Sequence, residues 1–133
     1  MFKKYTIEWN DFTAVFAVDH SIMTDEQLHE INNFWSDSDL RVDDENGDIT
    51  MAVLKMLAGV CFNLQVSYDL NTWGVMSRFD WDDDAGVEGW PKMDGTHGII
   101  ILSVDNVQFD ANDMSAKTET LEKMPPAPKR PSW

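Results

Sequence analysis

A long apolar segment in the middle of the chain constrains its folding more than any other feature. From Met51 to Leu64 the residues are apolar on nearly every side of the helix that they would form, and Lys55 and Asn63 are the main polar breaks. The carboxylate of Asp48 favours a helix start just before this segment, because a helix N-terminus attracts negative charge. A helix without a polar face must be enclosed by its own domain or shared with a second chain. The sequence leaves both options open: a central core helix, or the contact surface of a homodimer.

The N-terminal part of the chain predicts a β-hairpin followed by a helix. Residues 4–9 alternate polar and apolar side chains, as a half-buried strand does, and residues 13–18 again have strand composition. The pair Asn10-Asp11 between them is typical of a tight turn, so we expect an antiparallel hairpin. The stretch Thr24 to Gln27 matches a capping box, which predicts a helix over residues 24–36.

The remaining patterns predict an α+β fold. Residues 36–48 are expected to form a polar linker, residues 71–79 a short helix and residues 80–98 a long loop. The nearly continuous apolar run 99–104, in which only Ser103 is polar, predicts a central strand covered on both faces, and a further strand is expected near residues 115–119. The expected architecture is a single domain in which the N-terminal hairpin and C-terminal strands form a small antiparallel sheet, with two main helices packed on one face.

The composition of the chain changes near residue 123. With 133 residues, the chain is long enough for one domain with its own core. Prolines and basic residues dominate its end, and proline can neither continue a helix nor join a central strand. We therefore expect one acidic domain over residues 1–122 and a disordered, proline-rich basic tail over residues 123–133. No apolar leader and no stretch of membrane-spanning length is found, which predicts a cytoplasmic protein without membrane contact.

Negative charge is concentrated in the body of the chain. All 24 acidic residues lie between Glu8 and Glu122, where only five basic residues accompany them, so this span carries −19 against −14 for the whole chain. A surface of that sign repels nucleic acid and anionic membranes and attracts cationic proteins. Two acidic segments stand out, and tryptophans at the second one are expected to be exposed anchors. The candidate protein-binding residues are Asp37, Asp39, Asp43, Asp44, Glu45, Asp80, Trp81, Asp82, Asp83, Asp84, Glu88 and Trp90.

Metal binding and catalysis have weaker support. Carboxylates alternate through Asp80–Glu88 as in an oxygen-rich calcium loop, but Gly86 falls at the seventh position and Pro91 at the twelfth, which breaks the EF-hand pattern. No phosphate loop, nucleophile elbow or dinucleotide fingerprint is present, and the three histidines join no Cys/His ligand pattern. Asp94 and His97 could form an acid–base pair, although a glycine-flanked surface turn is the simpler interpretation. We expect no enzymatic activity, no cofactor and no metal; the alternative is a small metal-binding or hydrolytic protein that uses the Asp80–Glu88 loop.

Two stretches of the sequence resemble a known family. They are Tyr5-Thr-Ile-Glu-Trp-Asn-Asp-Phe, with the hairpin and helix that follow, and Phe79-Asp-Trp … Glu88-Gly-Trp-Pro-Lys-Met-Asp-Gly-Thr-His-Gly-Ile99. The chain is similar to a family of small phage and prophage proteins catalogued as a domain of unknown function. The resemblance covers roughly residues 4–110 and leaves out the proline-rich tail. It implies a phage context, but it brings no catalytic or binding residue.

Charge and context lead to a functional hypothesis. We expect a non-enzymatic, phage-type acidic protein that binds and inhibits a host nucleic-acid-binding protein in the host cytoplasm. A defence complex is one candidate target, as for anti-CRISPR or anti-restriction proteins whose charge imitates DNA. The partner would be a cationic host protein, without direct contact to nucleic acid or membrane. A phage accessory homodimer joined through Met51 to Leu64, with no mimicry role, is a further alternative.

Overall fold

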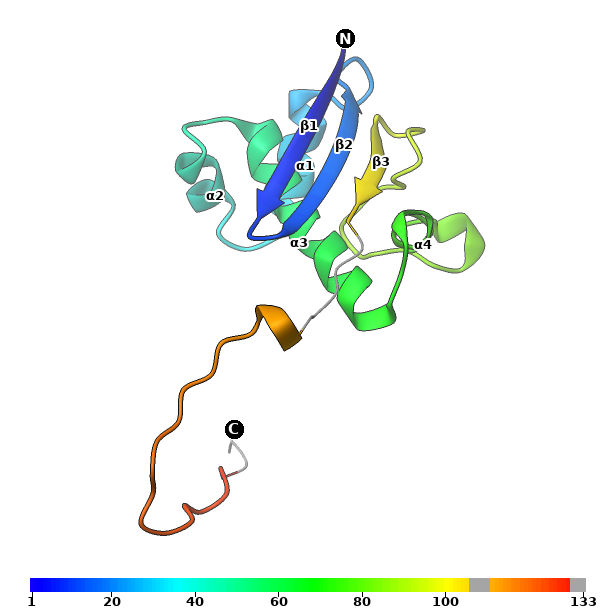
Figure 1. The fold of residues 1–133 in the computed structure, drawn as a ribbon. Helices are drawn as coiled ribbons and strands as arrows, with labels where there is room; N and C mark the ends of the chain where they lie inside the picture. Colours follow the sequence, from blue (N-terminus) through cyan, green and yellow to red (C-terminus); the bar gives the residue numbers. More distant parts are fainter. Residues whose placement is uncertain (106–110, 130–133) are drawn as a thin grey trace.

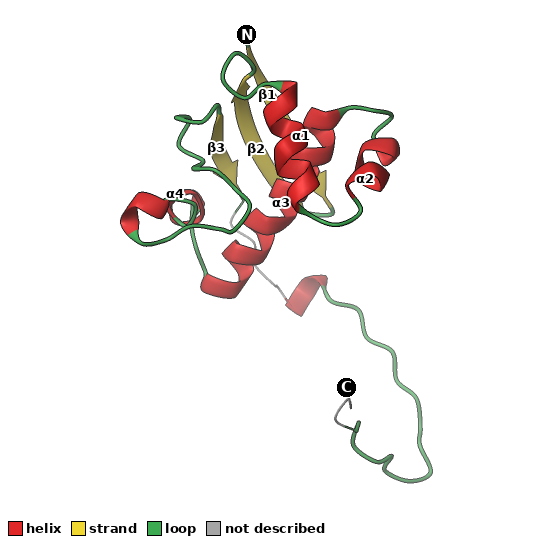
Figure 2. Ribbon diagram, turned by 180° about the vertical axis from the view of Figure 1, so that it is seen from behind, coloured by secondary structure: helices red, strands yellow, loops and turns green. Residues whose placement is uncertain are grey.

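The computed structural model describes residues 1–105 and 111–129 and forms a three-stranded antiparallel sheet with helices on one face (Figures 1 and 2). The strands lie in the order β1–β2–β3, and the α+β architecture expected from the sequence is confirmed. In chain order the elements are β1 (Phe2–Trp9), β2 (Phe12–Asp19), α1 (Asp25–Phe34), α2 (Ser38–Asp44), α3 (Ile49–Tyr68), α4 (Thr72–Ser77), the 3-10 turn η1 (Trp81–Asp83), β3 (Ile99–Val104) and the 3-10 turn η2 (Ala111–Asp113).

The predicted N-terminal hairpin and first helix are both present. Asn10 takes a left-handed conformation with φ of 53° at the hairpin turn, a conformation that asparagine tolerates. Tyr5 pairs with Phe16 and Ile7 with Ala14 across the two strands. Helix α1 begins after Thr24, whose side chain accepts a hydrogen bond of 3.3 Å from the backbone N–H of Gln27. The local signals in the sequence therefore placed these elements correctly.

Strand β3 is an edge strand, so its prediction as a central strand covered on both faces is wrong. The middle strand is β2, and β3 pairs with it alone among the described strands. A β-bulge shifts the alternation of side chains near the end of β3. Val15 pairs with Ser103 but Phe16 pairs with Ile101, so β3 holds one extra residue and Val104 turns back to the helix-covered face. Leu102 lies at the bulge and remains exposed.

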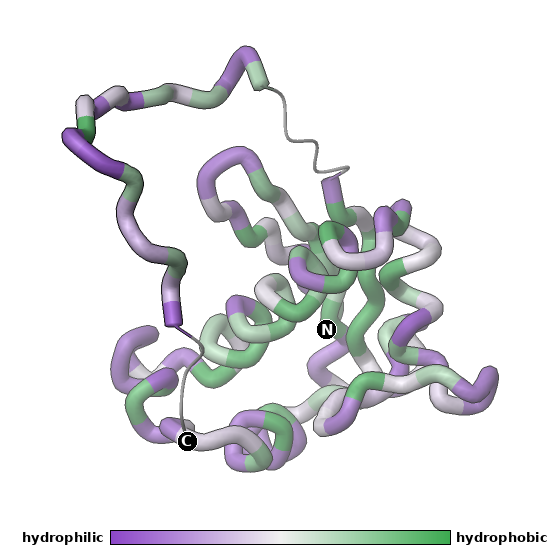
Figure 3. Tube along the Cα trace, turned by 90° about the horizontal axis from the view of Figure 1, so that it is seen from below, coloured by the Kyte–Doolittle hydropathy of each residue, from purple (hydrophilic) through white to green (hydrophobic). Residues whose placement is uncertain are grey.

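Helix α3 is the core helix of the domain. Its buried side chains include Val53, Leu54, Leu57 and Cys61, and it packs against α1 and the sheet. Coloured by hydropathy, this helix is mostly hydrophobic while the peripheral loops are mostly hydrophilic (Figure 3). The expectation that no stretch reaches membrane-spanning length is corrected: by length and composition α3, with 20 residues, could cross a membrane. Half of its apolar window is buried in the domain, and contacts with α1 and the sheet account for that part of its apolar character.

The expected linker 36–48 contains helix α2, which the sequence did not predict. Arg41 fastens α2 to the end of α1: its Nε donates to Asn32 Oδ1 at 2.7 Å, and its Nη1 donates to the Ser36 carbonyl at 2.6 Å. Three acidic residues in a helix of seven hid this element, because aspartate is a poor interior helix former. Hydrogen bonds from Arg41 to the end of α1 therefore stabilise a helix in a segment whose local propensity favours a loop.

Two further predictions concern the ends of the helical region and of the chain. The short helix expected over residues 71–79 is confirmed as α4, with the Asn71 side chain capping Gly74 N at 2.8 Å. The strand expected near residues 115–119 is absent: residues 114–129 are exposed and contain no strand. Arg130 and the rest of the expected tail to Trp133 lie outside the described residues, so the domain boundary at residue 122 remains a prediction.

Candidate protein-interaction site

The second acidic segment forms a compact turn, residues 80–88, which we call the acidic turn. The side chain of Asp80 accepts a hydrogen bond of 3.1 Å from the backbone N–H of Asp82 and starts η1. Asp84 takes a left-handed conformation with φ of 56°, and Gly86 N donates to the Arg78 carbonyl at 2.8 Å. These bonds hold the acidic side chains on a defined piece of backbone.

One cation partly neutralises the acidic turn. Lys92 Nζ binds Asp82 directly and lies 3.5 Å from Asp80 Oδ1, and the hydrogen bond to Asp82 raises the pKa of Lys92. In the described part of the chain, the exposed carboxylates of Asp83, Asp84 and Glu88 have no ion-pair partner. The turn therefore presents three free negative charges to solvent.

The two tryptophans expected as anchors have opposite environments. Trp81 is 50% exposed, and Lys92 Nζ lies 5.2 Å from the centroid of its ring. Trp90 is only 6% exposed, so its prediction as an exposed anchor is wrong. It packs in the core cluster and ties residues 89–97 to the domain. Trp81 is therefore the exposed aromatic anchor of the acidic turn.

The first acidic segment lies far from the acidic turn. Asp37, Asp39, Asp43 and Asp44 are exposed on and beside α2, whereas Glu45 pairs with Lys55 at 2.7 Å. In Figures 1 and 2, α2 lies on one flank of the sheet, and α4 with the following turn lies on the other. The predicted site residues therefore form two separate acidic surfaces.

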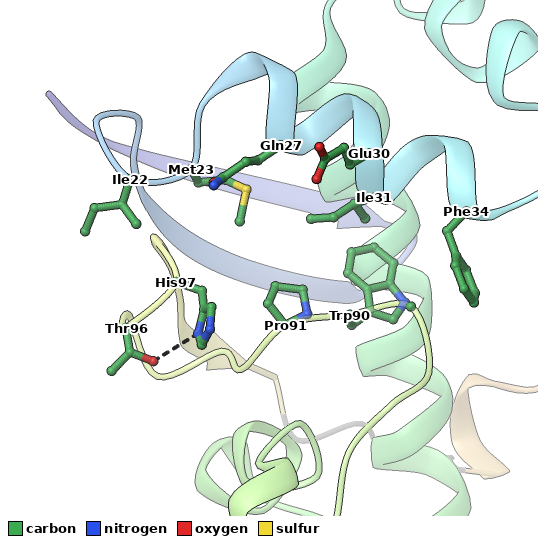
Figure 4. Close-up of a pocket in the computed structure, with 11 residues that line it drawn as sticks. Ile22, Met23, Gln27, Glu30, Ile31, Phe34, Trp90, Pro91, Thr96 and His97 are labelled. Carbon is green, nitrogen blue, oxygen red and sulfur yellow. Dashed lines mark hydrogen bonds between the residues drawn. The ribbon is translucent and has the colours of Figure 1, made fainter.

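A groove beside the acidic turn was missed by the sequence reasoning. It measures about 460 Å³ and lies between α1 and residues 89–97 (Figure 4). We call it the α1 groove. One wall comes from α1 and the residues before it, and the other from the loop. The lining side chains are Ile22, Met23, Gln27, Glu30, Ile31, Phe34, Trp90, Pro91, Thr96 and His97.

Two glycines explain why the loop lies so close to α1. A Cβ at Gly89 would lie 2.6 Å from the Phe34 ring, and φ at this glycine is +86°. A Cβ at Gly98 would lie 2.6 Å from the backbone nitrogen of Met23, with φ of +99°. Glycine permits both the close approach and the left-handed backbone. The Gly-Trp-Pro … Gly-Thr-His-Gly pattern was thus the signal in the sequence for this groove.

Asp94 and His97 do not form the acid–base pair considered from the sequence. Asp94 accepts hydrogen bonds from Thr96 N at 3.0 Å and from Thr96 Oγ1 at 2.5 Å, and the side-chain bond is the main cause of its lowered pKa. His97 Nδ1 lies 3.2 Å from the same hydroxyl, and the His97 ring meets the Trp81 ring edge-on, with 5.6 Å between their centroids.

Among residues 1–105 and 111–129, no three His, Cys, Asp or Glu side chains are grouped to hold a metal ion.

Comparisons with known proteins place the chain in a phage family. The family described as "Protein of unknown function (DUF2528)" matches residues 13–116. The chain belongs to this family. It is 46% identical over 117 residues to "Protein ea10" of Escherichia phage lambda, a match that covers 86% of this chain and 95% of the relative. The "Lambda prophage-derived protein ea10" of Escherichia coli O6:H1 matches with the same identity and coverage.

The family assignment confirms the resemblance found in the sequence, and no solved structure is significantly similar to the chain. The matched span runs from β2 to beyond η2 and so includes the acidic turn and both walls of the α1 groove. The family description names no activity, substrate or partner.

Proposed function

We propose that this chain is a non-enzymatic acidic binding protein that occupies a cationic surface of a host nucleic-acid-binding protein and inhibits it in the host cytoplasm. The carrying observation is the acidic turn, in which three unpaired, exposed carboxylates follow the half-exposed Trp81 along the chain. An aromatic anchor among charges is a common composition of protein interfaces, where the ring supplies binding energy and the charges steer association. The phage relatives support a host target, by analogy only.

The distribution of charge refines this proposal. A continuous imitation of duplex DNA needs one negative charge per ~1.7 Å along a single surface. The acids instead divide between the α2 flank and the acidic turn. We therefore assign direct contact to Asp80–Glu88 and long-range attraction to Asp37, Asp39, Asp43, Asp44 and Glu45. A defence complex of the CRISPR or restriction type remains the target class to test first.

A tagged pull-down from bacterial lysate with the full chain tests the proposal. We expect enrichment of one DNA- or RNA-handling complex that high salt releases, and loss of its nuclease or binding activity when the chain is added. The variant Asp82→Asn, Asp83→Asn, Asp84→Asn should lose this complex. The matched α2 variant Asp39→Asn, Asp43→Asn, Asp44→Asn should retain it. If no complex is enriched, or if both variants capture it like the wild type, the proposal fails.

A homodimer is the second candidate, because a row of aromatic rings that ends at the exposed Trp9 favours it. Trp9 is 62% exposed, and its ring lies 5.5 Å from that of Phe12, which lies 5.2 Å from that of Phe62. The row borders a groove of about 520 Å³ between β1 and α3, with Gly59 among its lining residues. Light scattering of the chain and of Trp9→Ser distinguishes the candidates: a dimer that this substitution dissociates supports the homodimer, and a monomer at high concentration excludes it.

A further inference from the structure

We propose that the α1 groove receives a segment of the partner protein that combines apolar side chains with lysine or arginine. This inference rests on the proposed function and names the partner chemistry beside the acidic turn. Four features of the groove carry it: its apolar walls, the sign of its charges, its continuity with Trp81, and its unpaired indole donors.

The walls of the groove are mainly apolar and open to solvent. Ile31, Met23 and Pro91 line it, and Ile22 and Phe34 at its rim are 44% and 53% exposed. In Figure 4, the side chains of the α1 wall face those of the loop wall across the groove. Concave sites with apolar walls and a few polar groups are the usual form of binding pockets, so the groove suits apolar side chains of a partner.

The charges at the groove are negative. Glu30 lines it, and no lysine or arginine is among its described lining residues. Asp25 and Glu26 lie in the first turn of the same helix, and Glu88 directly precedes Gly89 on the loop wall. An apolar segment that also carries cations would be attracted here, whereas an anionic segment, a nucleic acid or an anionic lipid would be repelled.

The groove is continuous with the acidic turn. His97 lines the groove, and its ring meets Trp81 edge-on at a centroid distance of 5.6 Å. A partner that contacts Trp81 and the carboxylates of the turn can therefore extend across His97 into the groove. One binding surface then joins two features that are separate in the sequence.

The groove region also contains polar groups that have no partner. The Nε1 atoms of Trp35 and Trp90 are buried, and neither has a hydrogen-bond acceptor among the described residues. Trp90 lines the groove, and Trp35 packs against Phe34 beside Gly89. A buried donor without an acceptor is unfavourable, so a backbone carbonyl of an inserted segment could satisfy one of them after a small side-chain shift.

Fluorescence anisotropy with defined peptides tests the inference on the full chain. The probe is a fluorescein-labelled amphipathic peptide with leucines at i, i+3, i+4 and i+7 and lysines elsewhere. A peptide of the same composition in scrambled order and an oligolysine of equal charge are the controls. We expect the amphipathic peptide to bind at physiological salt and both controls to bind more weakly.

Matched variants locate the binding. Ile22→Ser and Glu30→Lys alter the groove, while Leu40→Ser and Asp39→Lys make the same kinds of change on exposed α2 positions. We expect each groove variant to weaken binding about fivefold or more, equivalent to roughly 1 kcal/mol, and each α2 variant to weaken it less than about twofold. Circular dichroism confirms that each variant is folded.

Three results would overturn the inference: no binding of the amphipathic peptide, equal binding of all three peptides, or equal losses in groove and α2 variants. The last two would show attraction by net charge alone. A pull-down of the host target with the same variants distinguishes failure of the groove inference from failure of the proposed function. Capture lost in the Asp82–Asp84 variant but kept in the groove variants leaves the proposed function standing without the groove. Capture kept in the Asp82–Asp84 variant but lost in the groove variants overturns the proposed contact at the acidic turn and supports the groove.

Discussion

At the scale of single residues, a few side chains and two glycines build the candidate site. Gly89 permits the loop to approach Phe34, Trp90 fixes the loop in the core, and Trp81 remains outside as an anchor. Composition alone could not predict which of Trp81 and Trp90 is exposed, since both are tryptophans beside carboxylates. Their roles differ because residues distant in the sequence cover Trp90 and leave Trp81 half exposed.

Substitution of Gly89 tests this close approach. Gly89→Ala should lower the free energy of unfolding by about 2–4 kcal/mol, because it adds a clash with the Phe34 ring to the cost of a positive φ. Gly47→Ala is the matched control, since Gly47 has the same φ of +86° but open space around the added Cβ. It should cost about 1 kcal/mol. Urea unfolding of both variants gives the comparison, and equal losses would exclude a steric role for Gly89.

The single cysteine gives a second prediction at this scale. Burial raises the pKa of the Cys61 thiol from 9.0 to about 12. The native thiol should therefore stay neutral and react with thiol reagents only as fast as the protein unfolds. Since the unfolded thiol ionises at lower pH, the stability contributed by neutral Cys61 is complete below pH 9 and falls as the pH rises towards 12. Rapid labelling of the native protein at pH 8 would contradict this.

At the scale of elements, local signals identified most helices and strands, but tertiary contacts decided their surroundings. Three features could be predicted because each depends on near neighbours in the chain. They are the Thr24 cap, the Asn10 turn and the apolar residues of α3. Helix α2 was not predicted, because its order depends on Arg41 reaching Asn32 on α1. The edge position of β3 was also missed, since apolar residues occupy edge and central strands alike.

Removal of the Arg41 side chain tests how α2 is held. Arg41→Ala should cost about 2–3 kcal/mol of stability, because it removes hydrogen bonds to Asn32 and Ser36 and leaves the buried Asn32 amide oxygen unpaired. Lys55→Ala, which breaks the pair between the half-exposed Lys55 and Glu45, should cost less than about 1 kcal/mol. Chemical denaturation measures both. If Arg41→Ala lowers the free energy of unfolding no more than Lys55→Ala does, the hydrogen bonds of Arg41 are not what holds α2 in place.

At the scale of the whole molecule, the sheet separates two acidic surfaces (Figure 1). The acidic turn carries the exposed Trp81 and adjoins the α1 groove, whereas α2 has neither feature in the described structure. Charge on both flanks attracts a cationic partner from a distance, but only one flank combines charge with an aromatic anchor. Because of this difference, variants of the two surfaces should have different effects on partner binding.

Association kinetics with the captured host target tests the asymmetry. Neutralising Asp82, Asp83 and Asp84 together should slow association about tenfold at low salt and flatten its salt dependence, because close charges steer the encounter. Neutralising Asp39, Asp43 and Asp44 should slow it less and leave the dissociation rate unchanged. Stopped-flow measurements at several salt concentrations supply the rates. Identical effects of the two variants would mean that net charge alone steers the partner.

A calcium titration tests the metal-binding alternative for the acidic turn. Because Lys92 already binds Asp82 and lies close to Asp80, two of the carboxylates that a calcium loop would need are engaged. Millimolar Ca²⁺ should therefore leave the melting temperature unchanged, with Mg²⁺ as the control for ionic strength. A melting shift specific to Ca²⁺, and lost in Asp82→Asn, would restore this alternative.

The sequence by itself determined the α+β class, the hairpin, the capped first helix, the apolar core helix and the concentration of negative charge. Each follows from residue type and near-neighbour spacing, which set backbone preference and periodicity. Only the tertiary structure decided that Trp90 is buried, that β3 lies at the sheet edge, that the acidic segments lie apart, and that α1 and residues 89–97 enclose a groove. Those properties depend on which distant residues come together, such as Gly89 and Phe34, because long-range packing determines the exposure of each side chain.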